Sequence, residues 1–251
     1  MTDKEVIFRI DVDTPTGSLL LNKLHLKRGY LGYLRTLIAL MKQFGIKASF
    51  MFIPGRTTPS PEILGEILDT DSEIALHAVE VIPETLCKQK AEMEKDVGRP
   101  ILGISYHGRD LLDSVLHELT RKSRYVAYYN PFESLLAGFR YDATGYSYLP
   151  DEPTFLHLSE RRILLFKGYV DITWGSRYGP PMPKPDDKYL RQGLNIFMIH
   201  PNYLDRYGFR RATRDDVRAV FGHVVKQEAR VRTYAEVCEE HEGVAGHCGT
   251  L

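Results

Sequence analysis

Two aspartates, Asp11 and Asp13, end the first apolar run of the chain and are separated by a single residue. The run over residues 5–12 is rich in β-branched side chains and predicts a buried strand. Because side chains alternate along a strand, both carboxylates are expected on one face of it. Two like charges this close raise the pKa of one carboxyl group unless a cation lies between them. The pair therefore suggests a divalent metal, and an aspartate that caps the next turn is the simpler alternative.

Three later strands predicted from the sequence also end in groups that bind metals or transfer protons. His77 ends the third strand, His107 follows the fourth, and His200 follows a late one. The carboxyl ends of parallel strands share one rim of a barrel, so these side chains could converge with the two aspartates. Zinc and its neighbours accept two imidazoles and one carboxylate and keep positions open for water and substrate. Such a centre, with a spare aspartate and a separate histidine for proton transfer, would support hydrolysis of an amide or ester.

Strand-like and helix-like segments alternate between these motifs, which is typical of a parallel sheet or barrel. The predicted strands are 5–12, 47–53, 73–77 and 101–106, with further candidates at 125–129, 139–141, 163–166 and 194–199. The predicted helices are 27–44, 61–68, 84–97, 110–122 and 214–228, with a short last helix after residues 231–234. Residues 142–159 and 175–189 are rich in Pro, Gly, Asp and Tyr and are expected to form long loops near the site. We therefore predict one α/β domain over residues 1–240 and a disordered tail over residues 241–251.

The composition argues against several classes of protein. The 251 residues include 33 Lys and Arg and 33 Asp and Glu, a balance that disfavours a nucleic-acid binder with a broad basic surface. No apolar stretch approaches the length of a membrane span, and the polar first residues lack a signal core. Three widely spaced cysteines, Cys87, Cys238 and Cys248, are expected to be reduced thiols. These features predict a cytoplasmic protein, and homo-oligomerisation stays open.

The order of the motifs resembles the polysaccharide deacetylase superfamily, also described as the NodB-homology or carbohydrate esterase 4 group. The resemblance covers most of residues 5–240. It is carried by Asp-x-Asp at 11–13, His77 after Glu-Ile-Ala-Leu, Ser-Tyr-His-Gly-Arg at 105–109, Asp-Ile-Thr-Trp at 171–174 and Phe-Met-Ile-His-Pro at 197–201. It implies a distorted (β/α)7-type barrel that binds a divalent metal, with zinc expected and cobalt or nickel as alternatives.

By this resemblance, Asp11 would be the catalytic base and His200 the general acid. Asp13 and His77 would be metal ligands. The family's second motif usually supplies another histidine four residues after the first, and this chain has Val81 there.

Two residues could replace the missing ligand. His107 is the first choice because it lies at the tip of the neighbouring predicted strand. Glu80 is the second choice, since it is close to His77 in sequence and a carboxylate also binds metal.

Four further residues are expected around the substrate. The resemblance gives Arg109 the task of orienting the base, and it gives Asp171 and Trp174 positions in the lining of the pocket. Asp142 either binds a sugar hydroxyl or caps a turn, and the sequence favours neither.

The predicted activity is metal-dependent removal of an acetyl group from a sugar or a related small amide or ester, with an intracellular precursor as substrate. Two other classes stay open. A carbohydrate-binding protein on the same barrel could have lost its metal, as Val81 suggests. A glycosyltransferase also uses Asp-x-Asp, but this pair ends the first strand and follows no segment that could hold a nucleotide.

Overall fold

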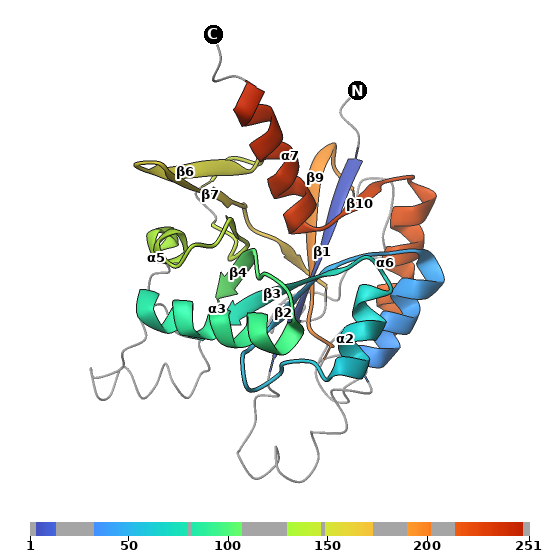
Figure 1. The fold of residues 1–251 in the computed structure, drawn as a ribbon. Coiled ribbons are helices and arrows are strands. Elements are labelled where there is room, and N and C mark those ends of the chain that lie inside the picture. Colours follow the sequence, from blue (N-terminus) through green and yellow to red (C-terminus); the bar gives the residue numbers. More distant parts are fainter. Residues whose placement is uncertain are drawn as a thin grey trace, which may run out of the picture.

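A curled, ten-stranded sheet runs through the computed structural model and is flanked by helices (Figure 1). The structure describes residues 4–13, 33–79, 82–106, 130–146, 149–172, 190–201 and 214–247, with side chains described to residue 243. The strands are β1 (Lys4–Val12), β2 (Ser49–Phe52), β3 (Glu73–Ala78), β4 (Gly103–Tyr106), β5 (Tyr141–Asp142), β6 (Thr154–Leu158), β7 (Arg161–Leu165), β8 (Val170–Asp171), β9 (Gly193–Ile199) and β10 (Arg230–Arg232). The helices are residues 33–44, α2 (Pro61–Leu68), α3 (Pro83–Val97), α5 (Pro131–Leu136), α6 (Arg214–Lys226) and α7 (Tyr234–His247).

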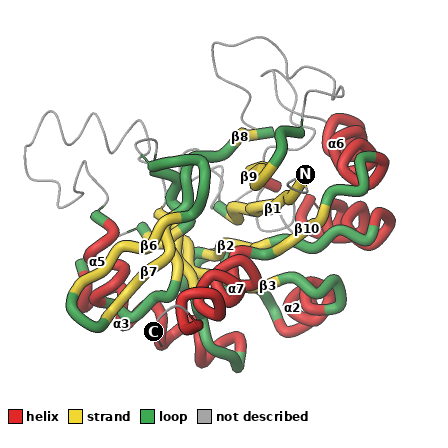
Figure 2. The backbone as a smooth tube through the Cα atoms, turned by 90° about the horizontal axis from the view of Figure 1, so that it is seen from above, coloured by secondary structure: helices red, strands yellow, loops and turns green. Residues whose placement is uncertain are grey.

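Parallel pairing places the carboxyl ends of most strands at one rim. The order is β6-β7-β5-β4-β3-β2-β1-β9-β8, with β10 paired to β1. Only β6 and β7 pair antiparallel among the described strands. The described sheet curls into a half-barrel whose path ends at β6 on one side and β8 on the other (Figure 2). This is the predicted α/β fold of the distorted-barrel type.

Both faces of strand β1 are covered. Its even-numbered residues join the helices in the outer core; Phe8, for example, packs edge to face with Phe221 of α6 at a centroid separation of 4.8 Å. Its odd-numbered residues point into the half-barrel, where Ile7 packs with Met51 and Ala75 from β2 and β3. The alternation predicted for this strand therefore sends Asp11 and Asp13 to the inside.

A glycine on β4 makes room inside the half-barrel for a tyrosine. A Cβ at Gly103 would lie 1.7 Å from the ring of Tyr141, so no larger residue fits without displacing that ring. The ring stacks on Tyr234 of α7 at 5.5 Å, and Phe166 meets Tyr234 edge to face at 4.6 Å. These aromatic rings belong to the same inner cluster as Ile7 of β1.

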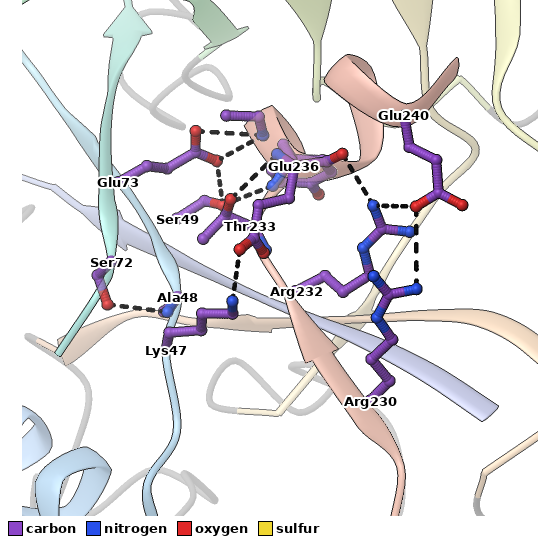
Figure 3. Close-up of polar contacts among 12 residues, drawn as sticks. Lys47, Ala48, Ser49, Ser72, Glu73, Arg230, Arg232, Thr233, Glu236 and Glu240 are labelled. Carbon is purple, nitrogen blue, oxygen red and sulfur yellow. Dashed lines mark hydrogen bonds and ion pairs between the residues drawn. The ribbon is translucent and has the colours of Figure 1, made fainter. Parts of the chain in front are cut away.

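Helix α7 covers the end of the sheet at which β1 begins (Figure 1). Its first turn carries a capping box, because Thr233 N donates to Glu236 Oε2 at 2.9 Å and Glu236 N donates to Thr233 Oγ1 at 3.3 Å. The next backbone N–H groups donate to the starts of neighbouring strands, Tyr234 N to Ser49 Oγ and Ala235 N to the Glu73 carboxylate (Figure 3). Polar groups thus anchor α7 at the rim opposite the aspartates.

The sequence predicted most elements at these positions. Helix α2 begins as expected, with Pro61 in its first turn and Ser60 as a cap that accepts from Ile63 N. The predicted loop over 142–159 is wrong for Thr154–Leu158, which forms β6. This strand has half-exposed residues and pairs with β7 only, so its sequence lacks the apolar run of a buried strand.

The prediction of a disordered tail is wrong for residues 241–247, which continue α7. There Glu242 pairs with Arg140, and this contact links the helix to the segment before β5. A pattern within the last residues of the chain could not predict a contact with so distant a residue. The predicted helix 110–122, the strand 125–129 and the loop 175–189 lie outside the described residues.

Candidate active site

Four of the predicted site residues converge at the carboxyl-end rim. Asp11 lies near the end of β1 and Asp13 directly follows it, His77 lies near the end of β3, and His200 follows β9. Strands β3 and β9 lie on opposite sides of β1 in the sheet, and the inward curl brings the two imidazoles over its end. All four are buried, with exposed fractions of 2%, 6%, 2% and 8% in the order given. The parallel sheet therefore brings together residues that are far apart in the sequence.

The carboxylate of Asp13 lies between the two imidazoles. His77 Nε2 is 3.0 Å from Asp13 Oδ1, and His200 Nε2 is 3.5 Å from Asp13 Oδ2. Asp11 is slightly farther, with its Oδ2 at 3.8 Å from His77 Nε2 and 4.0 Å from His200 Nε2. Both histidines thus direct Nε2 toward the aspartate pair.

The other ring nitrogen of each histidine has its own polar partner. His77 Nδ1 lies 2.8 Å from Ser105 Oγ on β4. His200 Nδ1 lies 3.5 Å from Asp171 Oδ2 on β8. These partners fix the ring orientations. Asp171, for which the resemblance implied a place in the pocket lining, contacts His200. The sequence analysis gave Ser105 no role.

Arg9, which the sequence analysis missed, is the nearest described cation to Asp11. It is 1% exposed, and its Nε and Nη2 donate to Asp11 Oδ1 and Oδ2 at 2.7 and 2.6 Å. The available signal was an arginine inside an apolar strand, two residues before Asp11 and hence on the same face.

The charges in the site hold Asp11 ionised and favour a protonated His200. Burial alone would raise the pKa of Asp11, but the charges of Arg9 and His77 and the Arg9 hydrogen bonds lower that pKa to about 2. Burial opposes the charged form of His200, yet the Asp171 hydrogen bond and the charges of Asp13 and Asp11 raise its pKa. One carboxylate that accepts protons thus lies beside an imidazole that can donate one.

Comparison with solved structures agrees with this reading of the fold. A candidate polysaccharide deacetylase from Mycobacterium smegmatis superposes with a TM-score of 0.65 at 16% identity, covering 97% of this chain and 92% of its own. A candidate polysaccharide deacetylase from Pseudomonas aeruginosa PAO1 gives 0.62 at 11% identity, covering 94% and 89%. This chain has the polysaccharide deacetylase fold. No family model and no curated protein matches the sequence.

The polysaccharide deacetylase fold is not tied to a single named activity. Puue allantoinase also superposes, with a TM-score of 0.59 at 15% identity, covering 94% of this chain and 89% of its own. At such identities the likeness describes the backbone, and the chemistry has to be argued from the residues.

A metal site needs donor atoms that are close enough together to bind one ion. Asp13 Oδ1 and His77 Nε2 lie 3.0 Å apart, which is a hydrogen-bond distance. Two ligands of one tetrahedral metal at about 2.0–2.2 Å lie roughly 3.3–3.6 Å apart, so these two atoms would have to separate slightly to bind one ion. Within the described ranges, no set of three His, Cys, Asp or Glu side chains is arranged to hold a metal. The alternatives predicted for the third ligand, His107 and Glu80, lie outside the described residues, as does Val81.

Asp142 does not fit the sugar-binding alternative. It is 0% exposed, and it accepts hydrogen bonds from Thr144 N at 2.9 Å, Ser134 Oγ at 2.8 Å and Tyr146 OH at 2.9 Å. Burial also raises the pKa of its carboxyl group. The structure therefore favours the turn-capping role, since the carboxylate accepts hydrogen bonds from its own turn and from Ser134 of α5.

Two other predicted residues, Arg109 and Trp174, lie outside the described residues. A residue that the sequence analysis did not single out, Tyr169, lies with its ring over the Arg9 guanidinium, 4.9 Å from Cζ to the ring centroid. It is 39% exposed and precedes β8. Among the described helices, none is long and apolar enough to cross a membrane.

Proposed function

We propose that the protein is a metal-dependent deacetylase that hydrolyses an acetyl amide or ester on a sugar or a related small molecule. The observation that carries the proposal is the buried cluster of Asp11, Asp13, His77 and His200 at the carboxyl-end rim. Acyl transfer to water needs a proton acceptor, a proton donor and a way to stabilise charge on the acyl oxygen. The cluster contains candidates for each task.

The ionised Asp11 accepts the proton of the attacking water in this proposal. His200, whose ring is oriented by Asp171, donates a proton to the departing amine or alcohol. Asp13 and His77 supply two metal ligands, with His107 or Glu80 as the third. The chemistry that a bound divalent cation would supply is polarisation of the acyl oxygen and activation of water.

The fold and the cluster together support the proposed substrate class. Two solved structures with this fold are named as candidate polysaccharide deacetylases, which supports an acetylated sugar. A third is named an allantoinase, so a small amide outside the carbohydrates belongs to the same proposal.

Acetate release tests the proposal. The protein, loaded with Zn²⁺ or Co²⁺, is incubated with N-acetylchitooligosaccharides, N-acetylglucosamine and O-acetylated xylan, and acetate is measured. Asp11→Asn and His77→Ala should each lower the turnover at least about 100-fold, because each removes a group that acts in the reaction. His157→Ala, an exposed histidine on β6, is the matched control and should retain the wild-type rate.

Undiminished turnover in both site variants would refute the assigned roles. A wild-type protein that binds these sugars but releases no acetate with either metal would instead support the carbohydrate-binding alternative.

A further inference from the structure

Arg9 and Asp11 lie on the same strand, and the guanidinium of Arg9 pairs with the carboxylate of Asp11. Both side chains point into the half-barrel because they are two residues apart on β1. The guanidinium donates through two different nitrogens to the two carboxylate oxygens, at 2.7 and 2.6 Å. Pairing at two points fixes the plane of a carboxylate as well as its charge.

The remaining contacts of Arg9 fix the guanidinium itself. Nη1 donates to the carbonyl oxygen of Ala143 at 2.5 Å, just after β5, which is separated from β1 by three strands of the curled sheet. The Tyr169 ring covers the guanidinium. Each nitrogen of the head group therefore has an acceptor, and Arg9 spans the interior of the half-barrel as a rigid support.

Stability alone does not account for this ion pair. Arg9 and Asp11 are 1% and 2% exposed, and a buried ion pair generally gains little over apolar residues of the same volume. The neighbouring interior position on β1, Ile7, is apolar. The Asp11 oxygen that pairs with Arg9 Nη2 is also the one that lies nearest His77 and His200. Arg9 Nη2 therefore binds the Asp11 oxygen that faces the two histidines.

We propose that Arg9 is a positioning residue that orients Asp11 toward the attacking water, the task that the family resemblance gave to Arg109. This inference rests on the proposed function, since it presupposes that Asp11 is the base. Arg9 acts through Asp11, so its replacement should slow the chemical step without weakening the binding of substrate or metal.

Arg9→Lys tests this directly, because lysine keeps the charge but cannot pair with both carboxylate oxygens in one plane. We expect kcat for acetate release, on the best substrate of the panel above, to fall about 100-fold. KM and the affinity for Co²⁺, measured by calorimetric titration of the metal alone, should stay within about threefold. Arg232→Lys is the matched control: Arg232 is 4% exposed, pairs with Glu240 at 2.6 Å at the opposite end of the sheet, and should leave kcat unchanged (Figure 3).

A second variant distinguishes a positioning role of Arg9 from a general loss of the folded structure. Arg9→Ala leaves space for a guanidinium ion, and millimolar guanidinium in solution should restore part of its kcat, whereas it should not accelerate wild type or Arg232→Lys. If Arg9→Lys does not fold by circular dichroism, Arg9→Gln, which retains donors to Asp11, takes its place with the same expected loss of kcat.

The outcomes distinguish this inference from the function on which it rests. An active wild type together with an equally active Arg9→Lys overturns the inference and leaves the deacetylase proposal intact. A parallel loss of Co²⁺ affinity and kcat also overturns it, because Arg9 would then support the whole site. A wild type that releases no acetate from any substrate removes the deacetylase function, and the positioning role falls with it.

Discussion

In each histidine of the site, Nδ1 contacts a polar partner, and the two partners differ in charge. Ser105, a neutral hydroxyl, contacts Nδ1 of His77, while Asp171, a carboxylate, contacts Nδ1 of His200. A carboxylate favours the charged imidazolium, whereas a hydroxyl can donate to or accept from a neutral ring. The two rings are thus suited to different tasks: His77 to presenting Nε2 to Asp13 or a metal and His200 to donating a proton.

Asp171→Asn should lower kcat at least about tenfold, because the His200 ring loses the anion that orients it and favours its protonated form. The measurement is steady-state acetate release by Asp171→Asn, His200→Ala and the double variant. If Asp171 acts through His200, adding Asp171→Asn to His200→Ala should cost little further activity. Additive losses in the double variant would show that Asp171 acts independently.

At the level of elements, helix α7 is attached to the strand starts through a carboxylate. Glu73 begins β3, and its two oxygens accept from the backbone N–H of Ala235 at 3.2 Å each (Figure 3). The Ser49 hydroxyl donates to the same carboxylate. Burial nevertheless raises the pKa of Glu73 to about 7, above its ordinary 4.5, despite these hydrogen bonds.

The folded protein therefore binds a proton at Glu73 more tightly than the unfolded chain does. The resulting stability is fully present below pH 4.5 and is lost as the pH rises through about 7. We expect the free energy of unfolding of the wild type to fall by up to about 2–3 kcal/mol more than that of Glu73→Gln between pH 4.5 and 7.5.

Urea denaturation at several pH values measures this difference. Glu239→Gln, at a 60% exposed carboxylate on the same helix, is the control and should follow the wild-type pH dependence. Identical pH dependence in wild type and Glu73→Gln would contradict the assignment of this titration to Glu73.

In the whole molecule, the half-barrel has two polar ends, and the interior between them is largely apolar but contains the buried Arg9 paired with Asp11. The end with α7 is closed by hydrogen bonds among backbone and side chains, and the other end gathers Asp11, Asp13 and the two histidines. Closure of one end leaves the carboxyl-end rim as the place where a ligand would reach the buried cluster, as is usual for parallel α/β barrels.

Metal binding at that rim should stabilise the whole domain, because a cation binds the folded cluster and not the separated residues of the unfolded chain. Saturating Co²⁺ or Zn²⁺, at about 100 times Kd, would add about 2.7 kcal/mol and raise Tm by roughly 5–10 °C. His77→Ala and Asp13→Asn should lose this shift, and the exposed His157→Ala should keep it. Differential scanning calorimetry with and without a chelator measures it, and a shift that survives in both site variants would locate the cation elsewhere.

The sequence by itself determined the local parts of this protein. The apolar run of β1 predicted a strand, and the alternation of side chains along any strand placed Asp11 and Asp13 on one face. The apolar runs that end at His77 and before His200 likewise predicted the ends of two further strands. These features depend on neighbours within a few residues, so a pattern along the chain contains them.

Tertiary structure decided which groups meet across strands. Three contacts join residues from different segments: Asp171 with His200, Asp142 with Ser134 of α5, and Arg9 with Ala143. The helical continuation of α7 past residue 241 likewise accompanies a contact between Arg140 and Glu242. Such contacts depend on how the sheet curls and in which register its strands pair, and neither property is encoded in a local run of residues.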